Sequence, residues 1–245
     1  MMMTMEQVKA HSVGLGFDHI EHLRGSTYRD VSTVVLIPTR GMINVRCAQA
    51  IHSMIAPMNA PKGLIYCEGD EVGHAYNRMI RTVLDHPVMG GWKYVLTIED
   101  DNLPPMDAHV RLIESIEAGP FDAVGGLYFT KGPGGQPMCY GDPDEYARTG
   151  VLDFRPRDVR EAVKRGAVVE CNGIAMGCTL YRMSLFREIE GPWFVTVSDV
   201  VPGQGPVAMT QDLYFCERAR RKGKRFATDC RVKVGHMDVT TGVVW

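Results

Sequence analysis

The residues best suited to chemistry are three consecutive acids, Glu99, Asp100 and Asp101, which follow the apolar segment 94–98. Clustered carboxylates repel one another unless a divalent cation, which prefers oxygen ligands, neutralises them. Their spacing places Glu99 and Asp101 on one face of an extended chain. The alternative is an acidic loop that water solvates. The segment therefore predicts either a metal site at the end of a buried strand or an ordinary surface turn.

The elements around this segment indicate which other polar residues could meet it. Apolar stretches alternate with stretches of helical period, which is typical of a mainly parallel α/β sheet with helices on both faces. The expected strands are 31–38, 63–67, 94–98 and 121–129, and the expected helices end near Pro57, Pro87 and Pro120. Ligands bind beyond the carboxyl ends of such strands. The pairs Thr39/Arg40 and Glu68/Asp70 follow the first two strands, so we expect them beside the acids.

The second half of the chain is less regular. Its expected elements are, in order, a surface excursion at 131–150, strands at 167–171 and 174–181, a long loop at 195–209 and a helix at 213–222. Asn172 and Gly173 form a candidate hairpin turn between the two strands. Asp212 precedes the last helix, where a carboxylate is favoured by the helix dipole.

Composition limits the class of protein. The chain has 245 residues, enough for one large α/β domain or two small ones. Its formal net charge of −2 gives no general attraction to nucleic acid or anionic membranes. No apolar run approaches the ~20 residues that cross a bilayer, and residues 1–30 lack the apolar centre of a signal peptide. The seven cysteines include no C-x-x-C pair. They indicate reduced thiols in a cytoplasmic protein and argue against a zinc site.

An ordered set of motifs resembles the glycosyltransferase A (GT-A) fold, in particular the inverting family 2 type and its phage-encoded relatives. The motifs are 34–40 (VVLIPTR), 77–78 (NR), 98–101 (IEDD), 122–128 (DAVGGLY), 172–182 (NGIAMGCTLYR), 211–223 (QDLYFCERARRKG) and 235–236 (GH). The resemblance implies a single Rossmann-like sheet within residues 31–236, of which 31–130 bind the nucleotide sugar and 131–236 form an irregular acceptor-side half. Residues 1–30 are then an N-terminal extension, and residues 237–245 a C-terminal tail.

The resemblance also implies roles for individual residues. Asp101 is the direct ligand of a Mn²⁺ or Mg²⁺ ion, Glu99 touches the ribose or reaches the metal through water, and His236 completes the metal shell. Asp212 is the general base that takes a proton from the attacking hydroxyl. The implied reaction moves a sugar from a nucleotide-sugar donor, with a UDP-sugar as first choice, to an acceptor hydroxyl with inversion.

Further contacts to the donor and acceptor follow from the same resemblance. The implied nucleotide-binding residues are Pro38, Thr39, Arg40, Glu68, Asp70, Arg78 and Asp100. Gly173 and Trp193 are assigned to the sugar or acceptor side, although a single tryptophan fits a core position equally well.

Two residues depart from the usual family pattern, and three other functions stay open. Glu99 and Gln211 stand where Asp and Glu are usual. One alternative is a transferase that glycosylates hydroxymethylated bases in DNA, for which the basic segment 218–225 could contact phosphates, although a solvated helix end explains it as well. The others are a nucleotidyltransferase, which would need a Gly-rich basic loop after the first strand, and a non-catalytic nucleotide-sugar binder.

Overall fold

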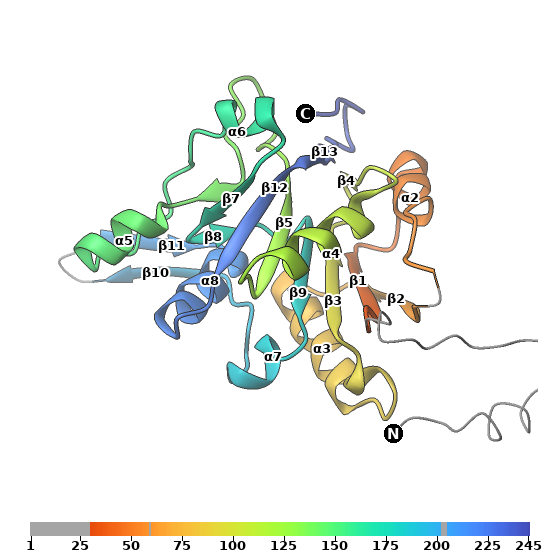
Figure 1. The fold of residues 1–245 in the computed structure, drawn as a ribbon. Helices are drawn as coiled ribbons and strands as arrows, with labels where there is room; N and C mark the ends of the chain where they lie inside the picture. Colours follow the sequence, from red (N-terminus) through yellow and green to blue (C-terminus); the bar gives the residue numbers. More distant parts are fainter. Residues whose placement is uncertain (1–29, 59, 202–204) are drawn as a thin grey trace, which may run out of the picture. The chain divides into compact units, whose positions relative to one another are not determined.

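A seven-stranded mixed sheet forms the centre of the structure (Figure 1). The computed structural model describes residues 30–58, 60–201 and 205–245, so the expected extension 1–30 lies outside the described residues apart from Asp30. Val31–Trp245 form one unit. The strands of the sheet, in spatial order, are β2 (Lys62–Glu68), β1 (Thr33–Thr39), β3 (Tyr94–Ile98), β9 (Cys178–Arg182), β5 (Ala123–Leu127), β12 (Phe226–Lys233) and β7 (Val168–Cys171).

The sheet is mainly parallel, as predicted, with one reversed strand inserted in its middle. β1 is parallel to β2 and β3, and β5 is parallel to β12. β9 is antiparallel to both β3 and β5, between which it lies, and β7 is antiparallel to β12 at the edge. β9 can occupy this central place because its residues are apolar on both faces: Leu180 joins one core and Tyr181 the other.

Helices cover both faces of the sheet. They are α2 (Val45–His52), α3 (Val72–Asp85), α4 (Ala108–Ala118), α5 (Pro143–Thr149), α6 (Arg160–Arg165), α7 (Leu185–Glu188) and α8 (Gln211–Arg221), together with the 3-10 helix η1 (Met89–Gly91). The core on one face contains Tyr76 of α3 and Phe215 of α8, and the core on the other contains Ile51 of α2 and Leu112 of α4. This arrangement confirms the predicted fold class.

Helix α2 forms where the sequence predicts a helix, but it buries a different face. The helical spacing of apolar residues in the sequence predicts that Val45 and Ile55 are buried, but they are 77% and 50% exposed. Cys47 and Ile51 are buried instead, four residues apart and therefore on one side of the helix. The Cys47 thiol contacts the Met237 sulfur at 3.8 Å, so a segment far along the chain selects the buried face.

Within the described residues, the second half contains two short antiparallel pairs, and the predicted hairpin at Asn172 is wrong. β8 (Gly173–Ile174) pairs with β6 (Cys139–Tyr140), whereas the flanking strands β7 and β9 pair elsewhere in the main sheet. Asn172 is buried, and its amide nitrogen donates to the carbonyl oxygens of Asp142 and Asp153. The expected loop at 195–209 contains the hairpin strands β10 (Val197–Val201) and β11 (Gly205–Met209).

A small strand pair joins the two halves of the chain at the carboxyl edge of the sheet. β4 (Asn102–Leu103), which follows β3, pairs antiparallel with β13 (Gly235–His236), which follows β12. The expected tail 237–245 folds back on this pair: the backbones of His236 and Trp245 exchange two hydrogen bonds of 3.0 Å. Within the described ranges, no helix has the length and apolar character needed to cross a membrane.

Candidate functional site

Asp101 and His236 face each other at the carboxyl edge of the sheet because β4 pairs with β13. The distance from Asp101 Oδ2 to His236 Nε2 is 3.6 Å. The other ring nitrogen, Nδ1, lies 2.8 Å from the carbonyl oxygen of Phe129. Since a carbonyl oxygen only accepts, Nδ1 carries a hydrogen, and in the neutral ring it is then Nε2, on the Asp101 side, that has the lone pair. A histidine held in this way by a backbone carbonyl has the tautomer and orientation of a metal ligand.

The Asp101 carboxylate also has an oxygen suited to a cation. Its Oδ1 is buried and makes no hydrogen bond, which is costly for a carboxylate unless a ligand satisfies it. With His236 Nε2 it provides oxygen and nitrogen ligands that fit Mn²⁺ or Mg²⁺, whose further positions phosphate and water commonly fill. Among the described residues, no three His, Cys, Asp or Glu side chains are grouped to hold a metal ion, and Glu99 as a further contact to the metal stays a prediction.

The three acids lie in a turn and not along an extended chain. The Asn102 N–H donates to the Glu99 carbonyl oxygen over 3.1 Å. The predicted extended conformation of residues 99–101 is therefore wrong, because β3 ends at Ile98 and the chain turns before β4 begins. Burial, followed by the charges of Asp101 and Asp212, raises the pKa of the Glu99 carboxyl to about 8. Asp212 is therefore close enough to this acidic turn to act on it electrostatically.

Asp212 lies in the first turn of α8 and is only 6% exposed. Its Oδ1 accepts a hydrogen bond of 2.9 Å from the Leu213 N–H. Burial raises the pKa of the Asp212 carboxyl, and hydrogen bonds from Thr210 and Leu213 offset that rise only in part. The carboxylate is consequently a stronger base than an aspartate in water. Support of the helix start and acceptance of a proton are compatible in this geometry.

The ends of β1 and β2 meet at the same edge. Thr39 lies opposite Glu68 in the parallel register, and the Gly69 N–H donates to the Thr39 carbonyl oxygen over 3.0 Å. Gly41 has a φ of +101°, and a Cβ there would lie 2.6 Å from Glu68 Oε1, so the turn after β1 requires glycine. Arg40 and Glu68 are exposed and can contact a ligand at this edge.

Arg78 reaches this edge from α3 and is paired with a carboxylate. Its NH2 group is 3.1 Å from Asp70 Oδ2 and 2.9 Å from Cys67 Sγ. Because the Arg78 side chain is 60% exposed, this ion pair is weak, and a phosphate group can replace the carboxylate. Asp100 is half-buried in the acidic turn. Pro38, in contrast, is buried in β1 opposite Cys67, where it positions the end of the strand; its contact with a nucleotide stays a prediction.

The two residues predicted for the sugar or acceptor side are packed inside the protein. A Cβ on the buried Gly173 would lie 2.8 Å from Phe154 Cδ1 and 3.0 Å from Leu213 Cδ2, so any larger residue would crowd these two side chains. Trp193 is 4% exposed, its indole N–H donates to the Ile189 carbonyl oxygen over 2.6 Å, and its ring meets Phe186 edge-on. The prediction that Trp193 stacks on a sugar is wrong, because stacking requires an open ring face.

Lys131 is the site residue that sequence reasoning missed. Its ammonium nitrogen lies 2.5 Å from Asp101 Oδ2, although residues 131–150 were expected to be a surface excursion. The only local signal is a lysine that directly precedes the glycine-rich stretch 132–135. Asn77, which belongs to the motif 77–78, has a structural contact: its amide Oδ1 accepts a hydrogen bond from the backbone N–H of Trp193 over 2.8 Å.

The basic segment 218–225 is bound to groups of the protein itself. Its contacts are Arg218 with the carbonyl oxygens of Glu190 and Pro192, Arg221 with Glu217, Lys222 with the Glu188 carbonyl oxygen, Lys224 with Glu188 and Asp122, and Arg225 with Glu170. An α-helix rises 1.5 Å per residue, so this end of α8 lies roughly 15 Å from Asp212. These contacts favour a capped helix end over a surface for nucleic acid phosphates.

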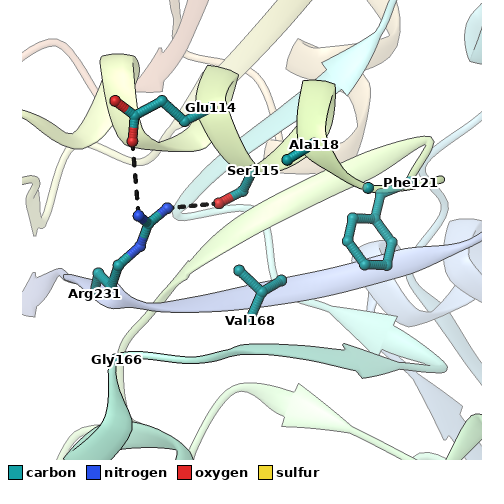
Figure 2. A pocket seen from close by; sticks show the side chains of 8 residues that line it. Glu114, Ser115, Ala118, Phe121, Gly166, Val168 and Arg231 are labelled. Carbon is teal, nitrogen blue, oxygen red and sulfur yellow. Dashed lines mark hydrogen bonds and ion pairs between the residues drawn. The ribbon is translucent and has the colours of Figure 1, made fainter.

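A separate pocket of about 420 Å³ lies between α4, β7 and β12 (Figure 2). It is lined by Glu114, Ser115, Ala118, Gly119, Phe121, Gly166, Val168 and Arg231, none of which is a predicted site residue. The Arg231 guanidinium donates to Ser115 over 2.9 Å and to Asp229 over 2.8 Å, and it faces Glu114. The charged groups here already have partners in the protein, so we assign this pocket no chemistry.

Comparison with known proteins identifies the fold. No family model and no curated protein matches the sequence. A197 from STIV superposes with a TM-score of 0.56 and 16% identity, over 84% of this chain and 85% of that chain. GalNAc-T7, solved with UDP, GalNAc and Mn²⁺, superposes with a TM-score of 0.54 and 9% identity, over 85% of this chain and 44% of that one. The chain thus spans less than half of GalNAc-T7. At these identities the likeness concerns the fold alone, which is of the GT-A type.

Proposed function

We propose that this protein is a metal-dependent glycosyltransferase that moves a sugar from a nucleotide-sugar donor, with a UDP-sugar as first choice, to an acceptor hydroxyl with inversion. The observation that carries the proposal is the Asp101–His236 pair, with its unsatisfied carboxylate oxygen and its oriented Nε2, together with the buried Asp212, whose charge acts on Glu99 of the same acidic turn. The GT-A fold supports it, and so does a structural neighbour that was solved with UDP, GalNAc and Mn²⁺.

In this proposal the residues at the carboxyl ends of the strands bind the donor. Asp101 and His236 would hold Mn²⁺ or Mg²⁺, which supplies positive charge to the diphosphate as it leaves. Thr39, Arg40 and Glu68 present a hydroxyl, a guanidinium and a carboxylate at the common edge of β1 and β2, where they would bind the base and ribose. Arg78, Asp70 and Asp100 stay in this proposal as residues of the same nucleotide-binding edge, and Glu99 as a contact to the ribose.

In this proposal Asp212 acts on the acceptor as the general base. As the acceptor oxygen bonds to the anomeric carbon and the bond to the diphosphate oxygen breaks, the hydroxyl proton passes to the Asp212 carboxylate. Its raised pKa makes this transfer more favourable than it would be to an aspartate in water. Attack from the side opposite the leaving diphosphate inverts the anomeric carbon.

The proposal is tested by calorimetric titration with UDP-, GDP- and dTDP-sugars, with and without Mn²⁺. We expect one nucleotide class to bind only with the metal, and Asp101→Asn to weaken that binding by roughly 10–100-fold, as loss of a metal ligand or its support usually does. Asp158→Asn removes an exposed carboxylate paired with Arg160 and serves as the matched control. Binding that ignores Mn²⁺, or no binding by the wild type, would contradict the proposal.

A further inference from the structure

Lys131 projects from a short loop whose base is fixed. The Thr130 N–H donates to the Gln136 carbonyl oxygen, and the Gln136 N–H donates to the Thr130 hydroxyl, both over 2.9 Å. Between these residues, Gly132 and Gly134 have φ values of +106° and +78°, which glycine adopts at little cost. Lys131 is thus the first residue of the loop after the hydrogen bonds that join Thr130 to Gln136. The two glycines follow it at the tip of the loop.

The Lys131 ammonium forms an ion pair with the carboxylate oxygen of Asp101 that faces His236. It contacts Asp101 Oδ2, the same atom that lies 3.6 Å from His236 Nε2. Its charge also acts on Glu99 and on Asp238. The side chain is 34% exposed, so part of it lies in contact with water. Without a metal, Lys131 supplies the positive charge that the acidic turn requires.

We propose that Lys131 binds the diphosphate of the nucleotide-sugar donor, and that its ammonium leaves Asp101 for the diphosphate when a divalent cation occupies the Asp101–His236 pair. This inference rests on the proposed function. A divalent cation on Asp101 repels an ammonium on the same carboxylate, and the flexible lysine stem lets the ammonium turn away. A lysine ammonium is a compact point charge that suits phosphate oxygens, and the diphosphate would bring negative charge next to it.

Two binding measurements on the complete chain separate this role from a purely structural ion pair. The first is Mn²⁺ binding without nucleotide, followed by the electron paramagnetic resonance signal of free Mn²⁺. The second is calorimetric titration of UDP at saturating Mn²⁺. For Lys131→Met we expect Mn²⁺ to bind about tenfold more tightly, because its competitor is gone, and UDP to bind about tenfold more weakly, because one charge contact is lost. Lys131→Arg should restore most of the UDP affinity.

The two affinities must move in opposite directions. Lys164→Met, which removes an exposed lysine paired with Glu161, should change neither and is the matched control. If Lys131→Met weakens Mn²⁺ binding, or leaves UDP binding unchanged, the proposed role of Lys131 is wrong while the proposed function stands. If the wild type binds none of UDP, GDP and dTDP at saturating Mn²⁺, both are overturned.

Discussion

Replacement of Asp212 by asparagine tests the central catalytic assignment with the smallest change of shape. The amide oxygen of asparagine can still accept the hydrogen bond that the Leu213 N–H donates to Asp212 Oδ1 over 2.9 Å. The start of α8 should therefore keep its geometry. The substitution removes the negative charge and the ability to accept a proton, and leaves Asp101 and His236 in place.

The expected effects on rate and on stability differ in size. Loss of a general base lowers kcat by about 10²–10⁴-fold. Loss of a carboxylate at a helix N-terminus costs roughly 0.3–1 kcal/mol, but Asp212 is 6% exposed and its charge raises the pKa of Glu99. Removal of the buried Asp212 charge relieves its repulsion of Glu99, and this gain offsets the loss at the helix N-terminus. We therefore expect the free energy of unfolding to change by less than about 1 kcal/mol.

Three measurements decide the matter: transfer rate with a saturating donor, donor affinity by calorimetry, and urea unfolding. Asp212→Asn should lose transfer and keep both donor affinity and stability. Asp144→Asn, an exposed aspartate in the first turn of α5, shows what loss of a helix-start carboxylate does by itself. Transfer by Asp212→Asn at a rate close to wild type would show that another group takes the proton.

Two further predictions concern residues in the interior. Burial, followed by the charge of Lys62, lowers the pKa of His109 to about 4. Between pH 6.5 and 4 the unfolded chain therefore binds more protons than the folded one. Urea unfolding of the wild type should show a loss of about 3 kcal/mol in the free energy of unfolding from pH 7 to pH 4, and His109→Gln should lose less. An equal loss in the wild type and the variant would contradict this prediction. Trp193→Phe should lower stability by roughly 1–3 kcal/mol, because the Ile189 carbonyl loses its donor, and leave donor affinity unchanged; a weaker donor affinity would restore the sugar-stacking prediction.

Local patterns in the sequence were enough to predict much of the framework. The apolar runs marked β1, β2, β3 and β5, because a buried strand needs continuous apolar side chains. The same runs placed Thr39, Glu68 and the acidic turn at one edge, since carboxyl ends of parallel strands meet there. The position of Asp212 at a helix start was also readable locally. The pairing of Asp101 with His236 was predicted only through the family resemblance.

Contacts between distant segments decided the rest. The insertion of β9 depends on pairing of residues 178–182 with two strands far earlier in the chain, β3 at 94–98 and β5 at 123–127. The Lys131–Asp101 contact and the burial of Trp193 likewise depend on which segments pack together. Helix α2 buries Cys47 because Met237 lies beside it. The sequence by itself determined which residues can form strands, helices and an acidic turn, because those preferences are local. Tertiary structure alone decided which charges share a carboxylate and which ring faces are closed, because these depend on neighbours that no local pattern specifies.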